Sequence, residues 1–356
     1  MQENNRHTIN TNKTVSDGLT QINDLPKTRT LICVDQQGVV VGMVTDGDIR
    51  RGLLKGVTLL DPISRVMNVH FSSLQKDELS IDTIRNFRAK NSVILPVLSK
   101  EGMLHQVVDF TRQKSYLPIH CLIQAGGQGR RLRPLTNDLP KPLVTIQDVP
   151  IIGYVLHHLI EFGVRKITLS LHYKSDMIVE YINALDIPNV TFDFIYEDSP
   201  MGTIGGFSQL ELINDNPVLI MNSDLLTKLN IEEFLYTHLT NSADLTVATR
   251  SYETTIPYGV LNVSGKKVSG IQEKPVITQL INSGIYFINP KLKEYVRSTP
   301  MDTPELIDLC LAEGRSVVYH RFSDPWIDIG SHDELNRAIE MVKSNSLYEI
   351  SLFNPR

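Results

Sequence analysis

Residues 126–144 hold glycines and cations at a spacing that could bind phosphate. The stretch reads GGQGRRLRPLTNDLPKPLV and follows a short apolar run that predicts the end of a buried strand. Glycine lets a backbone approach a ligand closely and present its N–H groups, and such turns bind anions. Three glycines open the stretch: Gly126, Gly127 and Gly129. Four cations follow them: Arg130, Arg131, Arg133 and Lys141. The spacing therefore indicates a site for a highly charged phosphate chain.

Two aspartates later in the chain could complete such a site. Asp224 ends the apolar run VLIMNSD, and Asp328 lies in DPWIDIG. In a doubly wound sheet, ligands bind beyond the carboxyl ends of the strands, so we expect both carboxylates at the rim of one cleft. Together with triphosphate oxygens they would supply the oxygen-rich shell that Mg²⁺ prefers. The plainer alternatives are a turn residue for Asp224 and a helix-flanking residue for Asp328.

The complete string is more specific than any part of it. It is neither the Walker pattern nor the full GxGxxG spacing. It closely resembles the GGxGTRLxPLTxxxPKPLV signature of the sugar-1-phosphate nucleotidylyltransferases, the nucleotide-sugar pyrophosphorylases. Arg130 departs from that pattern, which usually has threonine there, and Gln124 stands where many members carry an apolar residue. The resemblance implies an enzyme that uses Mg²⁺ to transfer a nucleotidyl group from a nucleoside triphosphate to a sugar-1-phosphate, releasing pyrophosphate.

The resemblance also implies roles for particular residues. Such a transfer depends mainly on positioning and on neutralising developing charge. Arg131 would hold the β- and γ-phosphates, Lys141 would bridge the α-phosphate and the sugar phosphate, and Asp224 and Asp328 would hold the metal. The nucleotide would contact Gln124, Gly126, Gly127, Gly129, Arg130, Arg131, Gly202 and Thr203. The sugar phosphate would contact Gly259, Glu273, Lys274 and Asn282. The alternatives are ordinary turns for the glycines and an exposed hairpin end for Glu273 and Lys274.

The N-terminal part has a different pattern. Two units of strands and helices follow one another between residues 14 and 115, and the phrase GMVTDGDIRRGL begins at Gly42. They resemble a tandem pair of CBS domains, small α+β modules that bind adenine nucleotides. Thr45 and Asp48 match the Thr/Ser-x-x-Asp motif that holds a ribose, whereas the corresponding VVDFTRQ in the second unit has lost both residues. Alternatively, Asp46 and Asp48 simply cap the following helix.

The expected elements place these residues in two folded parts. After a loose N-terminus at 1–13 and the CBS pair at 14–115, strands alternate with helices over 119–356. This alternation predicts an α/β, Rossmann-like, doubly wound and mostly parallel sheet, the glycosyltransferase-A-like arrangement that the resemblance implies. We also expect a hairpin turning at Ser264 and Gly265, and a helix with Thr303 as its N-cap.

The composition and charge of the chain limit the classes of partner that it can be expected to bind. The chain has 356 residues, of which 41% are hydrophobic and 21% charged, as in a soluble protein of two domains. A formal charge of −5 gives no reason to expect nucleic acid or an anionic membrane. The N-terminus lacks the apolar core of a signal peptide. The three cysteines are widely separated, which favours a reducing cytoplasm. CBS pairs commonly associate, so we expect a homodimer or a larger homo-oligomer.

The resemblance also points to substrates. Proteins that join these modules in this order are similar to guanylyltransferases that make GDP-sugars for surface glycans, including a branch that activates glucosamine-1-phosphate for legionaminic acid synthesis. We therefore expect GTP with glucosamine-1-phosphate or mannose-1-phosphate. The alternatives are UTP, CTP or dTTP as donor, a heptose-1-phosphate as acceptor, and an inactive fold that senses nucleotides or acts as a scaffold.

Overall fold

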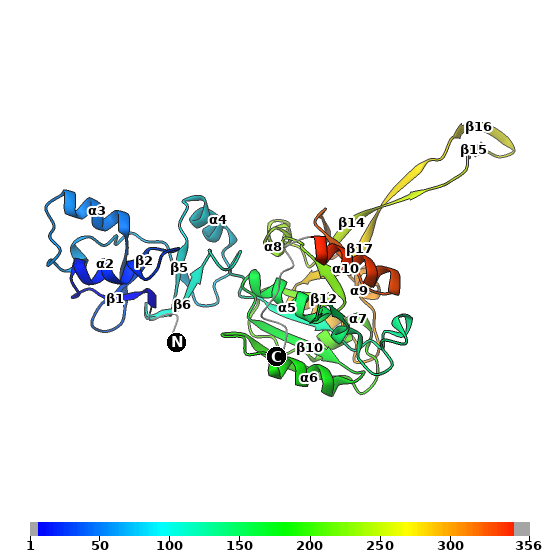
Figure 1. Cartoon of the computed structure of the whole chain (residues 1–356). Coiled ribbons are helices and arrows are strands. Elements are labelled where there is room, and N and C mark those ends of the chain that lie inside the picture. Colours follow the sequence, from blue (N-terminus) through cyan, green and yellow to red (C-terminus); the bar gives the residue numbers. More distant parts are fainter. Residues whose placement is uncertain (1–5, 345–356) are drawn as a thin grey trace. The chain divides into compact units, whose positions relative to one another are not determined.

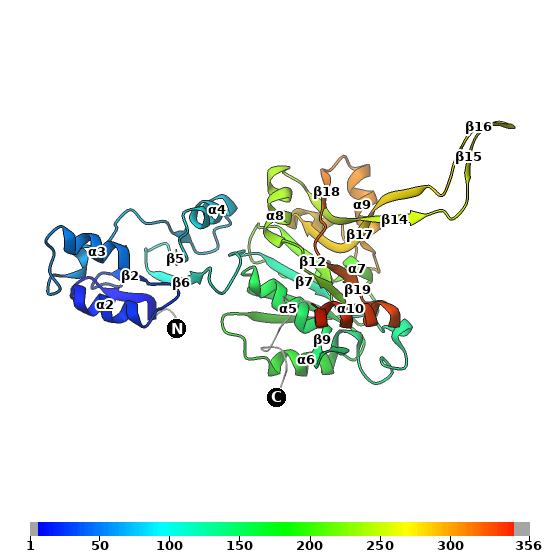
Figure 2. The ribbon, with the colours of Figure 1, turned by 45° about the horizontal axis from the view of Figure 1, so that its top comes forward.

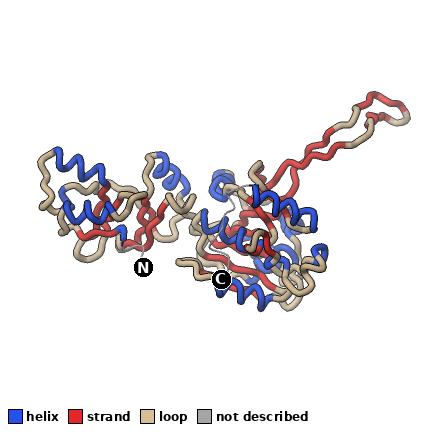
Figure 3. The backbone as a smooth tube through the Cα atoms, in the orientation of Figure 1, coloured by secondary structure: helices blue, strands red, loops and turns tan. Residues whose placement is uncertain are grey.

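The computed structural model describes residues 6–344, and within them the chain divides into two compact units. The N-terminal unit holds the residues up to Pro118 together with Glu161–Gly163, and the C-terminal unit holds Ile119–Ile160 and the chain from Val164 onward. Figure 1 labels many of the elements of both units, and Figure 3 distinguishes their helices from their strands.

The N-terminal unit contains two small sheets with the same topology. Their strand orders are β1-β2-β3 and β4-β5-β6. In each sheet the first two strands are parallel and the third is antiparallel to the second. The strands are β1 (Thr8–Asn10), β2 (Thr30–Val34), β3 (Val40–Thr45), β4 (Leu74–Gln75), β5 (Ile94–Leu98) and β6 (Leu104–Asp109). The N-terminal unit therefore contains two similar three-stranded sheets, one after the other in the chain.

The helices of this unit repeat only in part. A helix joins the first strand to the second in each sheet, but only β3 is followed directly by a helix; β6 leads into a turn at 110–112. The helices are α2 (Val15–Asn23), α3 (Asp46–Leu54) and α4 (Ile81–Ala89), with a 3₁₀ turn η1 (Ile63–Arg65). One buried cluster contains side chains of both sheets: Ile32, Val40, Ile94 and Leu98.

The C-terminal unit is built on a sheet of seven strands in the order β11-β10-β7-β12-β17-β14-β18. Every neighbouring pair is parallel except the two that β17 makes with β12 and β14. The strands are β7 (His120–Gln124), β10 (Lys166–Leu171), β11 (Thr191–Tyr196), β12 (Val218–Asn222), β14 (Leu245–Thr255), β17 (Val276–Ile288) and β18 (Val317–Arg321). The predicted α/β fold with a mostly parallel sheet is confirmed.

Shorter elements complete this unit. Three pairs of short strands are β8 (Thr145–Ile146) with β9 (Val149–Pro150), β13 (Leu225–Thr227) with β19 (Trp326–Asp328), and β15 (Val260–Ser264) with β16 (Lys267–Gln272). The helices are α5 (Ile151–Glu161), α6 (Ser175–Ala184), α7 (Gly202–Gly205), α8 (Ile231–Thr240), α9 (Thr303–Ala312) and α10 (His332–Ser344). The 3₁₀ turns are η2 (Arg130–Leu132), η3 (Lys141–Leu143), η4 (Gly206–Gln209) and η5 (Pro290–Tyr295).

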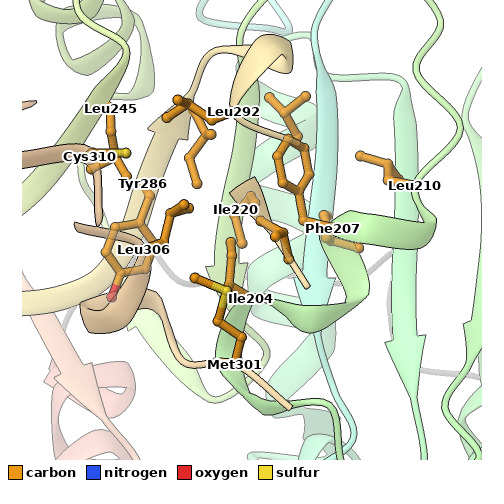
Figure 4. Close-up of a cluster of buried hydrophobic side chains, with 14 of the residues drawn as sticks. Ile204, Phe207, Leu210, Ile220, Leu245, Tyr286, Leu292, Met301, Leu306 and Cys310 are labelled. Atoms are coloured by element: carbon orange, nitrogen blue, oxygen red, sulfur yellow. The ribbon is translucent and has the colours of Figure 1, made fainter. Parts of the chain in front are cut away.

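Helices pack on both faces of the sheet because successive strand residues point to opposite sides. On one face, Tyr286 and Ile288 of β17 join a buried cluster with side chains from α7, η4, η5 and α9, shown in Figure 4. Phe287 lies between them and packs against Phe234 of α8, with ring centroids 4.7 Å apart. The first residue of α9 is Thr303, so the expected N-cap is wrong by one position. Asp302 caps this helix in a box with Glu305.

The order of the strands identifies where a ligand should bind. From β7 the chain moves to β10 and β11 on one side and then returns to β12 on the other. The crevice at such a reversal is the usual ligand site of a doubly wound sheet. Gln124 ends β7 and Asn222 ends β12, and the two are register partners. The glycine-rich stretch and Asp224 therefore both leave the sheet at this point.

One part of the C-terminal unit extends away from the sheet. Strands β14 and β17 continue past the core as a two-stranded ribbon, which leads into the hairpin of β15 and β16 (Figure 1). Figure 2 shows the bend between the ribbon and the hairpin. We call residues 250–281 the arm. The hairpin turns at Gly265, which has φ of 59°, as the sequence predicts. Within residues 6–344, no helix combines the length and apolar character needed to cross a membrane.

Candidate active site

The glycine-rich stretch forms a loop that leaves β7 and enters η2. Gly129 is the N-cap of this 3₁₀ turn and has φ of 61°, in the left-handed region that favours glycine. A Cβ on this residue would lie 2.9 Å from Cβ of Lys141. Thr136 donates its hydroxyl to the carbonyl oxygen of Gly129 over 2.8 Å. The loop is therefore tightly packed against the segment that carries Lys141, and only glycine fits there.

Lys141 projects from η3 toward the end of β12. Its neighbours Pro140 and Pro142 restrict the backbone on both sides. The ammonium nitrogen forms an ion pair with Oδ2 of Asp224, and the two side chains are 12% and 19% exposed. A partly buried pair of this kind is screened less by solvent than a surface pair. The structure thus brings together two groups that lie 83 positions apart in the chain.

These groups line a cavity of about 260 Å³. Nothing lies within 4 Å of the place where a Cβ of Gly127 would stand, so the loop leaves open space on that side. The lining residues are Gly127, Gly129, Arg130, Arg131, Lys141, Asp224 and Gly330. Six of these seven are residues that the sequence nominates for phosphate, nucleotide or metal binding. Their roles remain predictions, but they share one cavity.

Asp328 lies beside Asp224 because two short strands pair. In the pairing of β13 with β19, Asp328 stands opposite Leu225, the residue that follows Asp224. The carbonyl oxygen of Asp224 accepts a hydrogen bond from the backbone N–H of Ile329 over 3.0 Å. Burial, and then the nearby charge of Asp224, raise the pKa of Asp328 to about 6, although Lys141 and Arg131 oppose this.

The two carboxylates fit a hard divalent cation. Oδ1 of Asp224 is buried and has no hydrogen-bond partner among the described residues. A buried acceptor without a donor is costly, and a second carboxylate beside it adds repulsion that a cation would remove. Oxygen ligands of this type suit Mg²⁺, which usually takes one or two carboxylates and completes its shell with phosphate and water.

Gly330 and Glu334 belong to the site, although the sequence reasoning assigned neither of them a role there. A Cβ on Gly330 would lie 3.1 Å from Nη2 of Arg131 and 3.2 Å from Oε2 of Glu334. Oε2 of Glu334 accepts hydrogen bonds from the backbone N–H of Gly330 at 2.9 Å and from the hydroxyl of Ser331 at 3.0 Å. Glu334 thus fixes the loop between Asp328 and α10 next to Arg131. The sequence does hold a signal for this contact, because Ser331 and Glu334 have the spacing of a capping box at the start of α10.

The remaining nucleotide candidates lie outside the cavity. Gln124 ends β7, where its Nε2 is buried without a hydrogen-bond partner among the described residues, and a Cβ on Gly126 would lie 3.2 Å from Cβ of His172. Gly202 has φ of 79°, and a Cβ added to it would lie only 2.3 Å from the carbonyl oxygen of Met301. The N–H of Thr203 donates to Oδ1 of Asp302 over 2.8 Å. Gly202 and Thr203 therefore already have a structural role, which is to hold the start of α9.

The sugar-phosphate candidates are divided between the body and the arm. Asn282 lies at the base of the arm, where it donates from Nδ2 to the hydroxyl of Tyr286 over 2.7 Å. Gly259, Glu273 and Lys274 lie at the joint between the ribbon and the hairpin, and a Cβ on Gly259 would be 3.0 Å from Oε2 of Glu273. The structure groups these three residues with one another but does not bring them to the cavity.

In the N-terminal unit, Thr45 and Asp48 bond to each other. Thr45 is the N-cap of α3, and its hydroxyl donates to Oδ2 of Asp48 over 2.6 Å. The backbone N–H of Asp48 donates back to the Thr45 hydroxyl at 3.2 Å. The plainer alternative therefore holds for Asp48, which takes part in the cap, but not for Asp46, which pairs with Arg50; nucleotide binding by Thr45 and Asp48 stays a prediction.

Comparisons with known proteins agree on the C-terminal unit. Residues 120–345 match the family model described as nucleotidyl transferase. A mannose-1-phosphate guanyltransferase of Yarrowia lipolytica is 31% identical over 217 residues, which is 59% of this chain and 60% of that protein. A mannose-1-phosphate guanylyltransferase catalytic subunit beta of Danio rerio is 29% identical over 218 residues, covering 59% and 61%. The chain therefore spans about three fifths of the length of these relatives.

Solved structures extend the likeness to the fold. HddC from Yersinia pseudotuberculosis is 27% identical, with a TM-score of 0.51, and the match covers 63% of this chain and 99% of HddC. The same protein complexed with GMP-PN matches with a TM-score of 0.50 over the same shares. A structure from Bacillus anthracis is 20% identical, with a TM-score of 0.53, and the match covers 66% of this chain and 99% of that protein's chain. At this identity the likeness shows the fold alone.

Proposed function

The chain belongs to the nucleotidyl transferase family. From that membership we propose that it transfers a nucleotidyl group from a nucleoside triphosphate to a sugar-1-phosphate, giving a nucleotide sugar and pyrophosphate. The observation that carries the proposal is the cavity at the strand reversal, which combines the glycine loop, Arg131, Lys141 and Asp224. Cations and N–H groups on one side and carboxylates on the other suit a metal-bound triphosphate.

The bond changes assign a task to each group. An oxygen of the sugar phosphate attacks the α-phosphorus, the bond from that phosphorus to the bridging oxygen breaks, and pyrophosphate leaves with the electron pair. Arg131 binds the leaving phosphates, and Lys141 neutralises charge that develops around the α-phosphorus. Asp224 and Asp328 would hold a Mg²⁺ ion, which when bound supplies charge neutralisation of the triphosphate oxygens. Lys141 must leave Asp224 to reach the phosphate.

We propose GTP as the donor and mannose-1-phosphate or glucosamine-1-phosphate as the acceptor. Support for guanine comes from relatives described as mannose-1-phosphate guanyltransferases and from the HddC complex with GMP-PN. UTP, CTP or dTTP as donor and a heptose-1-phosphate as acceptor are the alternatives within the same chemistry. We also propose a role in making nucleotide sugars for surface glycans, on the basis of the resemblance described in the sequence analysis.

For the N-terminal unit we propose a CBS pair with at most one adenine-nucleotide site, at Thr45 and Asp48. The repeat of two three-stranded sheets with the same pairing supports this proposal. The second repeat lacks a helix directly after β6, so it has no counterpart of the Thr45 capping position.

Pyrophosphate release tests the proposed reaction. GTP, UTP, CTP and dTTP are each combined with mannose-1-phosphate, glucosamine-1-phosphate, glucose-1-phosphate and a heptose-1-phosphate in the presence of Mg²⁺. We expect release with GTP and one of the sugars, and its loss in Lys141→Ala but not in Lys76→Ala, which removes an exposed lysine of the N-terminal unit. Nucleotide binding without release in every combination would instead favour the inactive, nucleotide-sensing fold.

A further inference from the structure

Arg130 is a cation of the cavity that departs from the glycine-rich signature. The signature usually has threonine at this position, whereas this chain has two neighbouring arginines, Arg130 and Arg131. Both belong to η2 and both line the cavity. Their backbone is held in place, because Gly129 caps this turn and the side chain of Leu132, which ends it, is fully buried. The chain therefore places one more cation at the cavity than the signature provides.

The two guanidinium groups contact different segments beside the cavity. Arg131 lies against the loop that precedes α10, since a Cβ on Gly330 would be 3.1 Å from its Nη2. Arg130 instead contacts the glycine-rich loop, where its Nε–H donates to Oε1 of Gln128 over 2.9 Å. Because Nε is in use, Nη1 and Nη2 of Arg130 are the donors left for a ligand, and such a pair matches two oxygens of one phosphate. Gln128 thus orients Arg130 for an anion.

Arg130 also has no carboxylate partner within residues 6–344, whereas Lys141 is paired with Asp224. A cation without a counter-ion beside other cations is repelled by them, and a bound anion removes this repulsion. Lys141 and Asp224 are 12% and 19% exposed, while Arg130 is exposed, so the lining of the cavity runs from a buried pair to an exposed arginine. A triphosphate whose α-phosphorus lies at Lys141 therefore extends its last phosphate toward Arg130.

We propose that Arg130 binds the terminal phosphate of the donor, so that this chain selects its nucleotide by the number of phosphates. This inference rests on the proposed function, because it takes Lys141 as the place of the α-phosphate. Arg130 and Arg131 then hold the leaving pyrophosphate through two separate guanidinium groups. Charge-assisted bonds to phosphate are stronger than those of a neutral hydroxyl, which is what threonine would offer. Pyrophosphate is therefore retained more tightly and inhibits the forward reaction more strongly than with threonine.

The first test measures the binding of pyrophosphate and requires no turnover. Calorimetry in the presence of Mg²⁺ should show that Arg130→Thr, which restores the residue of the signature, weakens binding about tenfold, the lower end for a bond to a charged group because Arg130 is exposed. Arg130→Lys keeps the charge without the fork and should lose about threefold. A wild-type chain that does not bind pyrophosphate, or an affinity of Arg130→Thr within threefold of the wild type, overturns the proposal.

Arg337→Thr is the matched control for this measurement. Arg337 is an exposed arginine of α10 in the same unit, so its replacement changes the net charge of the chain by the same amount. This variant should bind pyrophosphate as the wild type does. An equal loss in Arg337→Thr and Arg130→Thr would reduce the effect to long-range charge and refute a contact of Arg130 with the phosphate. Urea denaturation should show that both variants unfold at the wild-type midpoint.

The second test asks which phosphate Arg130 contacts. Calorimetry is repeated with GTP and GDP, or with the donor that pyrophosphate release identifies and its diphosphate. Arg130→Thr should weaken the binding of the triphosphate about tenfold and leave the diphosphate within twofold, because the base and the first two phosphates keep their contacts. Equal losses for both nucleotides would assign Arg130 to an inner phosphate and overturn the proposed selection by phosphate number.

A double-mutant cycle tests the orienting role of Gln128. Gln128→Ala alone should weaken the binding of the triphosphate about threefold, because Arg130 loses the bond that fixes its guanidinium group. In the Arg130→Thr background the same change should have no further effect. A loss that is equally large in both backgrounds would show that Gln128 acts independently of Arg130.

Steady-state kinetics separate this inference from the proposed function. In Arg130→Thr, the KM for the donor and the inhibition constant of pyrophosphate should both rise about tenfold, while the KM for the sugar-1-phosphate stays unchanged. If the wild-type chain releases no pyrophosphate with any pair of substrates, the proposed function fails, while the binding of pyrophosphate still decides whether Arg130 holds a terminal phosphate. If the wild-type chain is active and Arg130→Thr has the same two constants, the reaction stands and the role of Arg130 is refuted.

Discussion

The pairing of Lys141 with Asp224 joins the two sides of the candidate site. Lys141 lies next to Gly129 in the phosphate loop, and Asp224 follows β12 beside Asp328. Without substrate, each side chain neutralises the other in a partly buried place. A metal-bound triphosphate offers both of them better partners, because the cation takes the carboxylate and the phosphate takes the ammonium. If the proposed substrate binds here, we expect the pair to separate and both groups to take these partners.

Gly129 is the residue whose replacement should disturb this arrangement most directly. In Gly129→Ala, a Cβ in the left-handed region would also lie 2.9 Å from Cβ of Lys141. We expect the free energy of unfolding to fall by about 1–3 kcal/mol and pyrophosphate release to fall at least tenfold, because Lys141 is displaced. Urea denaturation of Gly127→Ala is the control, since nothing lies within 4 Å of that position. Equal stability losses in the two variants would contradict the packing argument.

At the scale of elements, buried histidines make the packing of helices on the sheet sensitive to acid. His238 of α8 is 2% exposed, and its Nδ1 contacts the hydroxyl of Thr246 in β14 at 2.8 Å. Burial lowers the pKa of His238 to about 4, and Asp244 opposes this only partly. His120 of β7 is held in the same way, with its pKa lowered to about 4 by burial and by Lys166. Both side chains are therefore neutral in the folded protein near neutral pH.

This predicts a loss of stability on acidification. Since the folded pKa of His238 lies below its ordinary 6.5, the unfolded chain binds the proton first as the pH falls. The contribution of His238 is complete above pH 6.5 and disappears progressively between 6.5 and about 4, by at most about 3 kcal/mol. Urea denaturation at several pH values should show that the free energy of unfolding falls less steeply with acidification in His238→Asn than in the wild type. His70→Asn, which changes an exposed histidine, should keep the wild-type dependence; an unchanged slope in His238→Asn would refute the assignment.

The caps of α2 and α3 offer a matched comparison for nucleotide binding. Thr14 and Asp17 form the same capping box at α2 that Thr45 and Asp48 form at α3. Thr14→Ala and Thr45→Ala should each lower the free energy of unfolding by about 1 kcal/mol, because each removes one cap. Only Thr45→Ala should also weaken the binding of AMP or ATP, measured by calorimetry. If both variants bind the nucleotide equally well, Thr45 and Asp48 serve only to cap the helix.

Local patterns predicted most of these elements, and the rule that ligands bind at strand ends placed Asp224 and Asp328 near one another, but individual contacts between distant segments could not be predicted. The glycine-rich loop and the hairpin at Gly265 follow from turn residues, and the cap at Asp302 could also have been found, since Asp302 and Glu305 have capping-box spacing. The Lys141–Asp224 pair requires the strand order, which the pattern of apolar residues does not specify. The arm was not predictable, because its alternation of apolar and polar residues is that of a half-buried strand.

At the scale of the whole molecule, two units with separate cores should respond to different ligands. The C-terminal unit buries its own cluster around Tyr286, and the N-terminal unit buries others around Ile49 and Leu95. Units with cores of their own can unfold independently. We therefore expect two transitions in a calorimetric scan, with MgGTP raising one of them and AMP the other.

The size of each shift follows from mass action. A ligand at 100 times its dissociation constant stabilises the unit that binds it by about 2.7 kcal/mol, which raises the midpoint of the C-terminal unit by about 5–10 °C and that of the smaller N-terminal unit by more. Asp224→Asn should abolish the response to MgGTP and keep the response to AMP, because Asp224 lines the cavity of the C-terminal unit and the proposed AMP site at Thr45 belongs to the other unit. Thr45→Ala should do the reverse. If either ligand moves both transitions together, the two sites are coupled through the chain, and each ligand then changes the affinity for the other.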